Sequence, residues 1–343
     1  MPTEHQATGV RLWAAMAVIY VVWGSTYFGI AVAIQTIPPF FMAAARFVIA
    51  GVVLLAWDVL RSPGARRWPT WRQLRDSAIV GILLLGVGNG FVALGERTVP
   101  SGIAAIIIGT MPVWFAVLGW IYFRERLPRV VVLGIIVGLG GVAALVWPVA
   151  GASSALDVGG LGILLLAELG WSHGSVYAAR RAHLPPRPIT ASALQMLFAS
   201  GFLLLEGVVT GEPSQFDPAK VSLTSIAGVV YLTVFGSMLA FTVYGWLLRH
   251  APISLIGTYA YVNPVVAVAL GSVFLNEQLT PRTLVASAVI IAAVALIVTA
   301  RGRESRSGAV AAAPARSRRS IGVTAAVTGA VRREPAPPRA PSG

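Results

Sequence analysis

The sequence predicts an all-α polytopic membrane protein with ten transmembrane helices, arranged as two inverted five-helix repeats. Hydrophobic residues make up 56% of the 343 residues and charged residues 11%, with a mean hydropathy of +0.77; a soluble domain carries about 25% charge. Five stretches have no charge at all: 12–45, 98–123, 130–156, 221–248 and 251–276. Each is longer than the roughly 20 residues that cross a bilayer as a helix.

The third observation is that the back half of the chain repeats the front half at a shift of 152 residues. The first copy contains Pro100, Pro112, Val113, Gly119, Glu125, Leu127, Val142, Ala143 and Val146, and the second contains Pro252, Pro264, Val265, Gly271, Glu277, Leu279, Val294, Ala295 and Val298. If each copy crosses the membrane five times, an odd number, the second copy is inverted. Inverted repeats with an interrupted helix in each half are typical of secondary transporters.

Ten helices fit between turn signals along the chain. They are expected at 11–33, 39–60, 77–97, 101–123, 129–149, 159–179, 189–210, 222–247, 253–275 and 282–300. The gaps hold Pro38-Pro39, residues 61–75, Val99-Pro100, Leu127-Pro128, residues 151–160, Pro185-Pro186, residues 211–220, Ala251-Pro252 and Thr280-Pro281. The first apolar run is much longer than the 7–15 residues of a signal peptide, so it is interpreted as the first helix. The repeats therefore span 11–149 and 159–300.

The basic residues predict the orientation of the chain. With the N-terminus inside, thirteen arginines between Arg11 and Arg249 face the cytoplasm, whereas Arg97, Lys220 and Arg282 face outside. The positive-inside rule therefore places both termini in the cytoplasm of a multi-pass protein of the inner or plasma membrane. Residues 301–343 hold nine further arginines without apolar periodicity, which predicts a disordered basic tail near anionic lipid headgroups. This distribution of the +13 net charge argues against nucleic-acid binding.

The composition also argues against enzymatic chemistry. The chain has no cysteine, which excludes disulfides, thiolate nucleophiles and cysteine-bound metal. It has no His-Glu-x-x-His motif and no Walker-type loop. We therefore expect neither an enzyme nor an ATP-driven pump, and neither a cofactor nor a metal.

Four motifs resemble those of a known family. They are Trp23-Gly-Ser-Thr-Tyr-Phe28 in the first helix, Arg46 in the second, Pro100-Ser-Gly-Ile-Ala-Ala105 before the fourth and Thr258-Tyr-Ala-Tyr-Val-Asn-Pro264 in the ninth. Over residues 11–300 the chain resembles the EamA family of the drug/metabolite transporter superfamily, in particular its metabolite exporters. The resemblance implies ten helices in two inverted repeats and transport of small organic molecules, often outward.

Two prolines at equivalent positions of the repeats are expected to interrupt their helices. Proline lacks an N–H, so Pro112 would free the carbonyl of Ile108 and Pro264 that of Ala260. Free carbonyls at the midplane must face protein or water, and they could accept hydrogen bonds from a substrate. A plain kink is the alternative interpretation.

Aromatic residues are candidates for the wall of a substrate cavity. Trp23 and Trp171 occupy similar places in the first helix of each repeat, and Tyr27 shares a face with Trp23. Tyr259 and Tyr261 are two residues apart and point to opposite sides of their helix, so only one can line the cavity fully. Such a wall suits a flat or apolar solute, although core packing is an equal alternative.

Polar residues within the predicted helices should face the protein interior. Asn89 and Asn263 are expected either to bind substrate or to hold helices together. Arg46 lies roughly 10 Å deep, where a charge needs water or a partner. It could bind a carboxylate-bearing substrate or pair structurally with Glu206 or Glu96, and the structural pair is the favoured interpretation.

Two further residues of the sixth helix are candidates for ion coupling. Glu168 is deep in the membrane, where a low dielectric favours the protonated carboxyl group, and it shares a face with Trp171, Ser172 and Ser175. His173 lies about 140° away around the helix and does not form a simple pair with Glu168. Small or apolar residues are usual at both positions in the resembled family, so these residues are particular to this chain.

The sequence as a whole predicts a secondary transporter that exports small organic metabolites, such as amino acids or related compounds, possibly drugs, by alternating access. An importer and a non-transporting membrane scaffold are the alternatives. A small-residue stripe of Gly134, Gly138 and Gly141 permits close helix packing, either within the chain or in a homodimer.

Overall fold

A computed structural model describes residues 9–61, 68–125, 127–146, 157–251, 253–256, 258–278 and 280–312. All regular structure in these ranges is helical. The chain divides into two compact units, residues 1–302 and residues 303–343. The fold below is that of the first unit.

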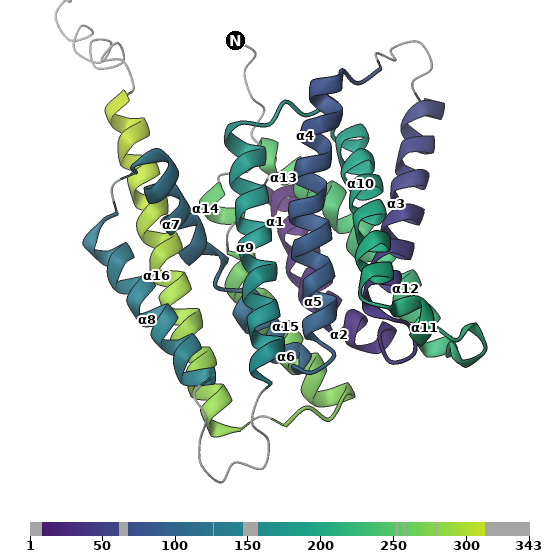
Figure 1. The fold of residues 1–343 in the computed structure, drawn as a ribbon. Coiled ribbons are helices and arrows are strands. Elements are labelled where there is room, and N and C mark those ends of the chain that lie inside the picture. The colour runs from purple at the N-terminus through teal and green to yellow at the C-terminus, as the bar shows by residue number, and fades with distance from the viewer. Residues whose placement is uncertain are drawn as a thin grey trace, which may run out of the picture. The chain divides into compact units, whose positions relative to one another are not determined.

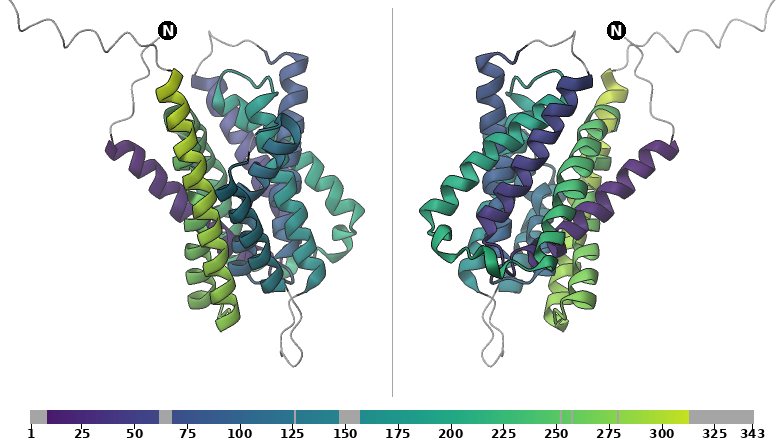
Figure 2. Two further views of the ribbon diagram at one scale, coloured as in Figure 1. Left: turned by 90° about the vertical axis from the view of Figure 1, so that its left-hand side faces the viewer. Right: turned by 90° about the vertical axis from the view of Figure 1, so that its right-hand side faces the viewer.

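The helices of the first repeat follow one another along the chain (Figure 1). They are α1 (Gly9–Val18), η1 (Ile19–Trp23), α2 (Gly24–Ala33), α3 (Pro39–Arg61), α4 (Trp71–Gly81), η2 (Ile82–Asn89), α5 (Gly90–Gly95), α6 (Ser101–Ile108), α7 (Met111–Phe123) and α8 (Arg129–Val146). The segments η1 and η2 are π-helical and continue directly into the α-helices on either side. Figure 2 shows α1 inclined to its neighbours, and η1 lies where it joins α2.

The helices of the second repeat follow those of the first. They are α9 (Val158–Arg180), α10 (Pro188–Val209), α11 (Glu212–Gln215), η3 (Pro218–Lys220), α12 (Leu223–Tyr231), η4 (Leu232–Ala240), α13 (Phe241–His250), α14 (Ile253–Ile256), α15 (Tyr259–Phe274) and α16 (Pro281–Ala312). The segment η4 is also π-helical, and the repeat shift places it on η2. Both copies therefore carry a π-helix in their third helix.

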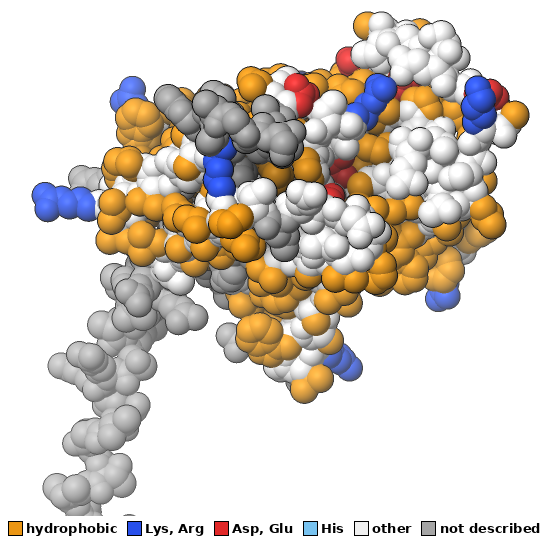
Figure 3. Space-filling view, turned by 90° about the horizontal axis from the view of Figure 1, so that it is seen from below, with side chains coloured by type: hydrophobic (Ala, Val, Ile, Leu, Met, Phe, Trp, Pro, Cys, Tyr) orange, Lys and Arg blue, Asp and Glu red, His pale blue; other side chains and the backbone are white. Residues whose placement is uncertain are grey.

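Seven helices of the described chain are long and apolar enough to cross a membrane. They are Gly9–Ala33, Pro39–Arg61, Trp71–Gly95, Ser101–Phe123, Pro188–Val209, Leu223–Tyr244 and Pro281–Ala300, with shorter apolar stretches at Arg129–Ala144 and Val262–Phe274. Many large hydrophobic side chains are exposed on these helices, among them Ile49, Trp120, Ile136 and Leu205. Seen from one end, hydrophobic side chains make up much of the periphery (Figure 3). The chain is thus an all-helical, multi-pass membrane protein.

Two details of the repeats match at the level of the backbone. Arg124 and Asn276, at equivalent positions after α7 and α15, adopt left-handed conformations with φ of 53° and 55°. Each is followed by a glutamate whose N–H donates to a glycine carbonyl six residues earlier, Glu125 to Gly119 and Glu277 to Gly271. Left-handed backbone disfavours residues with a Cβ, so two such turns at one repeat position indicate a shared structural requirement. The sequence repeat is therefore also a structural repeat.

The closest partners in the fold are α3 and α10, which pack side by side (Figure 1). Small residues such as Ala43, Ala50 and Ala193 lie fully buried between them, and small residues let membrane helices approach closely. Each helix begins beside a carboxylate near the end of the other. Glu212 accepts from the N–H groups of Phe40 and Phe41 at 2.9 and 2.8 Å.

At the opposite end of this pair, Asp58 of α3 accepts a hydrogen bond of 2.6 Å from the hydroxyl of Thr190 in α10. The guanidinium of Arg187 lies 3.5 Å from the same carboxylate. Negative charge at a helix N-terminus is stabilised by the helix dipole, whose positive end lies there. Burial nevertheless raises the pKa of Glu212, and its backbone donors offset this only in part. The two carboxylates fix the register of α3 against α10.

The glycine stripe of α8 packs against α16 of the same chain. A Cβ added at Gly134 would lie 2.6 Å from Ile297, and one at Gly141 would lie 2.7 Å from Ile290. Gly138 faces Ala293. The stripe is therefore occupied within the chain and does not supply a surface for a second copy.

Two predicted boundaries differ clearly from the structure, and a third lies outside the described residues. The third helix begins at Trp71 rather than at residue 77, because Thr70 and Gln73 form a capping box and Asp76 is buried with partners of its own. The last helix continues past residue 300 to Ala312, into the predicted tail. The first repeat was expected to end at 149, and residues 147–156 and 313–343 lie outside the described chain.

Candidate functional site

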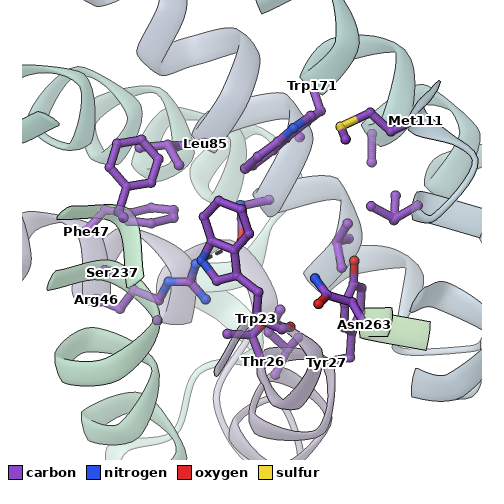
Figure 4. A pocket seen from close by; sticks show the side chains of 18 of the residues that line it. Trp23, Thr26, Tyr27, Arg46, Phe47, Leu85, Met111, Trp171, Ser237 and Asn263 are labelled. Atoms are coloured by element: carbon purple, nitrogen blue, oxygen red, sulfur yellow. Dashed lines mark hydrogen bonds between the residues drawn. The ribbon is translucent and has the colours of Figure 1, made fainter. Parts of the chain in front are cut away.

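A cavity lies among helices of both repeats (Figure 4). It leaves about 80 Å³ for the centres of water-sized molecules, which is room for several waters. Its lining is mostly apolar with a few convergent polar groups, as is usual for small-molecule sites. The lining residues are Trp23, Thr26, Tyr27, Ile30, Arg46, Phe47, Leu85, Gly88, Asn89, Val92, Ile108, Met111, Ala167, Trp171, Met196, Gly236, Ser237, Phe241, Tyr259 and Asn263.

All three π-helical segments contribute to this lining. Trp23 ends η1, Asn89 ends η2, and Ser237 lies within η4. The repeat shift places Ser237 on Leu85, and both line the cavity. π-Helical turns are rare and often occur at functional sites, because they widen the helix and alter the direction of its side chains. No pattern in the sequence predicts these segments, because apolar residues and glycine are common in any membrane helix.

The aromatic wall is a connected cluster centred on Trp23. Its ring centroid lies 6.2 Å from that of Trp171, 5.2 Å from that of Tyr259 and 4.9 Å from that of Tyr244. The contacts with Trp171 and Tyr259 are edge-to-face, the geometry that aromatic pairs favour. Tyr27 also faces the cavity. Five separate helical segments therefore build one aromatic surface.

Of the two tyrosines near the start of α15, the structure describes the side chain of Tyr259 only. Tyr259 is 8% exposed, lines the cavity, and its hydroxyl donates to the Met111 sulfur at 3.1 Å. The backbone of Tyr261 belongs to α15, but its side chain lies outside the described part of the structure. The expected opposition of the two side chains therefore stays a prediction.

Arg46 points into the cavity from α3 and is 4% exposed (Figure 4). Its Nη2 atom donates to Oδ1 of Asn89 at 2.8 Å, and its guanidinium lies 4.4 Å from the centroid of the Phe47 ring. The Nε atom has no hydrogen-bond partner among the described residues. Arg46 forms no ion pair within the described chain, so the expected structural pairs with Glu206 and Glu96 are absent there.

Asn263 bridges two of the cavity-lining segments. In the orientation that satisfies its surroundings, its amide nitrogen donates to the carbonyls of Tyr20 in η1 and Tyr259 in α15, at 3.2 and 3.3 Å. It is 5% exposed and also lines the cavity. Asn263 therefore joins the two segments that carry the aromatic wall.

The two prolines have different surroundings. The fourth helix is interrupted at Gly109 and Thr110, directly before Pro112 in the first turn of α7. Pro264 instead lies inside α15, which continues through it, and the interruption of the ninth helix comes before Tyr259. The missing N–H of Pro264 leaves the carbonyl of Ala260 facing Gly109, where a Cβ would lie 2.7 Å from that oxygen. The absence of a side chain at Gly109 lets the two helices meet there.

Glu168 is completely buried beside the cavity but does not line it. The hydroxyl of Ser172 donates to its Oε1 atom at 2.9 Å, and its Oε2 atom has no partner among the described residues. It lies within electrostatic range of Tyr27 and Tyr259. His173 instead contacts the hydroxyl of Tyr122 on α7 at 3.1 Å, away from the cavity lining. The two residues thus belong to different surroundings.

Sequence reasoning missed several residues of the site. Ser237 is 2% exposed, and its hydroxyl has no partner among the described residues. Thr26, Met111 and Phe47 also line the cavity. A serine in an apolar helix commonly donates to a backbone carbonyl of its own helix. Ser237 is therefore distinguished only by its hydroxyl, which has no such partner among the described residues. No group of three His, Asp or Glu side chains in the described chain is placed to hold a metal ion.

Comparison with known proteins relates this arrangement to one family. The sequence profile of the EamA-like transporter family matches residues 11–147 and 158–299. The "Uncharacterized inner membrane transporter YedA" of Escherichia coli K12 is 37% identical over 287 residues, which cover 83% of this chain and 90% of YedA. The "Uncharacterized transporter YvbV" of Bacillus subtilis 168 is 26% identical over 294 residues, or 86% and 93% of the two chains.

A solved crystal structure has the same fold. It superimposes with a TM-score of 0.60 at 20% sequence identity, over 86% of this chain and 99% of the other. At this identity the similarity concerns the fold alone. The two matched ranges agree with the two copies identified from the internal repeat.

Proposed function

Because this chain belongs to the EamA-like transporter family, we propose that it is a secondary carrier of small organic metabolites that works by alternating access. Membership of the family supports a membrane transporter rather than an enzyme, with a small-molecule substrate and the lipid bilayer as its partners. Export is the proposed direction, and it rests on the resemblance to metabolite exporters. Amino acids and related compounds form the first set of substrates to test.

One observation carries the proposal: a single cavity receives side chains from both copies of the repeat. Trp23 and Asn89 come from the first copy, and Trp171 and Asn263 come from the second. In carriers built from repeats, the substrate site lies where the repeats meet. Rocking of one copy against the other would then open this site to each side of the membrane in turn. A scaffold protein has no need for such a cavity.

In this proposal ten helices cross the membrane, and the second copy, 159–300, is inverted relative to the first, 11–149. The matched left-handed turns at Arg124 and Asn276 support the equivalence of the copies. The distribution of arginine supports cytoplasmic positions for both termini. The printed name of YedA supports the inner membrane as the location.

The aromatic residues and the two asparagines form the proposed substrate contacts. Trp23, Tyr27, Trp171 and Tyr259 would hold an apolar or flat part of the solute, because large rigid rings offer contact area at little entropic cost. Tyr261 stays a candidate on the basis of its position in the motif. Asn89 and Asn263 would orient polar groups of the solute. The interrupted helix before Pro112 and the kink at Pro264 would supply the hinge between the copies.

The test is efflux from cells that express the chain and are preloaded with labelled metabolites. We expect faster efflux of one chemical class than from cells without the chain. The double variant Trp23→Ala, Asn263→Ala should raise the apparent KM for that class by about tenfold or more, since it removes both an aromatic contact and a buried amide. The control Trp120→Ala removes an exposed tryptophan outside the cavity and should leave KM unchanged.

Three results would contradict the proposal. Equal KM values in the wild type and the double variant would exclude the cavity as the substrate site. Uptake in place of efflux would reverse the proposed direction. The absence of flux for every compound, with the protein shown to be in the membrane, would favour a scaffold.

A further inference from the structure

The cavity contains one charge, and that charge is positive. Arg46 is the single charged side chain among the described residues that line it. Holding a guanidinium away from water is costly unless charge and hydrogen bonds compensate. Asn89 provides one neutral acceptor at 2.8 Å, which leaves the charge itself without an opposite partner in contact. A bound anion would supply that partner.

The nearest buried acids do not fill this role. Glu96 is within electrostatic range of Arg46, yet neither of its carboxylate oxygens has a hydrogen-bond partner among the described residues. Glu168 is bonded to Ser172 on its own helix. Neither acid lines the cavity. The lining described by the structure is therefore selective for negative charge.

Two buried hydrogen-bond donors without partners among the described residues belong to side chains that line the cavity, and they come from different repeats. The Nε atom of Arg46 and the hydroxyl of Ser237 are both buried without partners, and both residues line the cavity. Arg46 comes from α3 of the first copy, and Ser237 comes from η4 of the second. Figure 4 shows Arg46 and Trp23 among the side chains that line the cavity. Unsatisfied buried donors are rare in proteins, and a ligand with acceptor oxygens would satisfy both.

On these grounds, and building on the carrier proposed above, we propose that the substrates are organic monocarboxylates with an aromatic or apolar body. The carboxylate accepts hydrogen bonds from Arg46 and Ser237, and the body of the solute lies against the rings of Trp23 and Trp171. Guanidinium and carboxylate groups match in charge and in geometry. A zwitterionic amino acid fits less well, because no acidic side chain lines the described cavity to receive its ammonium group.

The test compares three ligands that share one aromatic body and differ in charge. Phenylacetate is an anion, L-phenylalanine a zwitterion and phenethylamine a cation. Each is measured as a radiolabelled ligand by equilibrium dialysis against the full-length protein in lipid nanodiscs. We expect phenylacetate to bind at least about tenfold more tightly than the other two. Phenethylamine lacks the carboxylate, and phenylalanine would bury an ammonium group with no acidic partner in the described lining.

Variants then locate the carboxylate. Arg46→Gln should weaken phenylacetate binding about tenfold or more, Arg46→Lys by less, and Ser237→Ala by about threefold to tenfold. Arg61→Gln is the matched control, because it removes a cation from the same helix, where the guanidinium stacks on Trp57 outside the cavity. It should leave binding unchanged.

The wild-type ligand series decides the proposal even if a variant fails to fold. Equal or tighter binding of phenethylamine or phenylalanine overturns it, and so does the absence of phenylacetate binding. Transport in proteoliposomes separates the two proposals. Flux of other solutes without phenylacetate binding would leave the carrier intact and reject the substrate class. Phenylacetate binding without flux of any solute would keep the site and reject the carrier.

Discussion

The carboxylate of Glu277 caps the first turn of α6 through Ser101. Its Oε1 atom accepts hydrogen bonds from the N–H and the hydroxyl of Ser101, both at 2.7 Å, and its Oε2 atom accepts from the N–H of Gly102 at 3.1 Å. The two residues belong to different repeats. This contact therefore ties the end of α15 to the start of α6. The same two helices approach each other closely at Gly109 and Ala260.

Replacing Glu277 by Gln should lower the stability of the protein by about 1–3 kcal/mol. The amide keeps the shape but turns one acceptor into a donor that faces the donors of α6. The measurement is the free energy of unfolding, or the Tm, of purified protein in detergent. Glu206→Gln is the control, because the side chain of Glu206 makes no hydrogen bond or ion pair with the described residues and only its backbone carbonyl accepts from Thr210. A Tm equal to that of the wild type would show that the cap contributes nothing.

Gly109→Ala should destabilise the contact between the fourth and ninth helices. The added Cβ would lie 2.7 Å from the carbonyl oxygen of Ala260 and 3.0 Å from Cγ of Pro264. Overpacking of this kind costs about 1–3 kcal/mol, so we expect a lower Tm. The matched control is Gly140→Ala in α8, where nothing lies within 4 Å and alanine improves helix propensity. Equal Tm changes in the two variants would contradict the close approach.

The stability contributed by Asp157 should depend on pH. Hydrogen bonds from the Thr98 hydroxyl at 2.7 Å and the Gly160 N–H at 2.8 Å hold the pKa of Asp157 below its ordinary value. The ionised form is thus favoured in the folded state. Its contribution is present above the ordinary carboxyl pKa of about 3.9 and is lost as the pH falls through the lower folded pKa.

Asp157→Asn should therefore lower the Tm at pH 7, and the difference from the wild type should shrink below about pH 4. Scanning fluorimetry across this range measures the effect. Thr98→Val removes the strongest of the donors and should produce a smaller change of the same sign. A Tm difference for Asp157→Asn that stays constant from pH 7 to pH 3 would exclude the ionised carboxylate as its cause.

Glu168 provides a test of ion coupling. It is fully buried beside the cavity with one unpartnered oxygen, so a proton gained or lost there would alter the surroundings of Tyr27 and Tyr259. If coupling involves this group, flux by the wild type depends on pH, and flux by Glu168→Gln does not. His173→Gln is the control, since His173 contacts Tyr122 away from the cavity lining. The same pH dependence in the wild type and in Glu168→Gln would reject the hypothesis.

The sequence predicted much of the cavity lining because the residue types in a membrane helix indicate which of its side chains can face lipid. Polar or aromatic groups that cannot face lipid must face the interior. This argument selected Trp23, Arg46, Asn89, Trp171, Tyr259 and Asn263, all of which line the cavity. It could not select Ser237, because a serine can bond to its own helix and gives no outward sign of its position.

The environment of Arg46 shows the limit of the same reasoning. Its depth could be counted from Pro39, which predicted a buried charge in need of a partner. The choice between a structural ion pair and an open site depends on distances between helices far apart in sequence. In the described structure Arg46 meets Asn89 at 2.8 Å and no carboxylate within ion-pair distance. That outcome changed Arg46 from a structural residue into the centre of the proposed substrate site.

The sequence by itself determined the all-helical membrane class, most helix boundaries within a few residues, and the repeat. These follow from local physics, since apolar length, proline and glycine act within one helix. Only the tertiary structure decided where the helices widen into π-turns and that the ninth helix continues through Pro264. It also decided which helix packs on the glycine stripe of α8. Those properties arise from contacts between helices, whose energies depend on three-dimensional packing rather than on the order of residues along the chain.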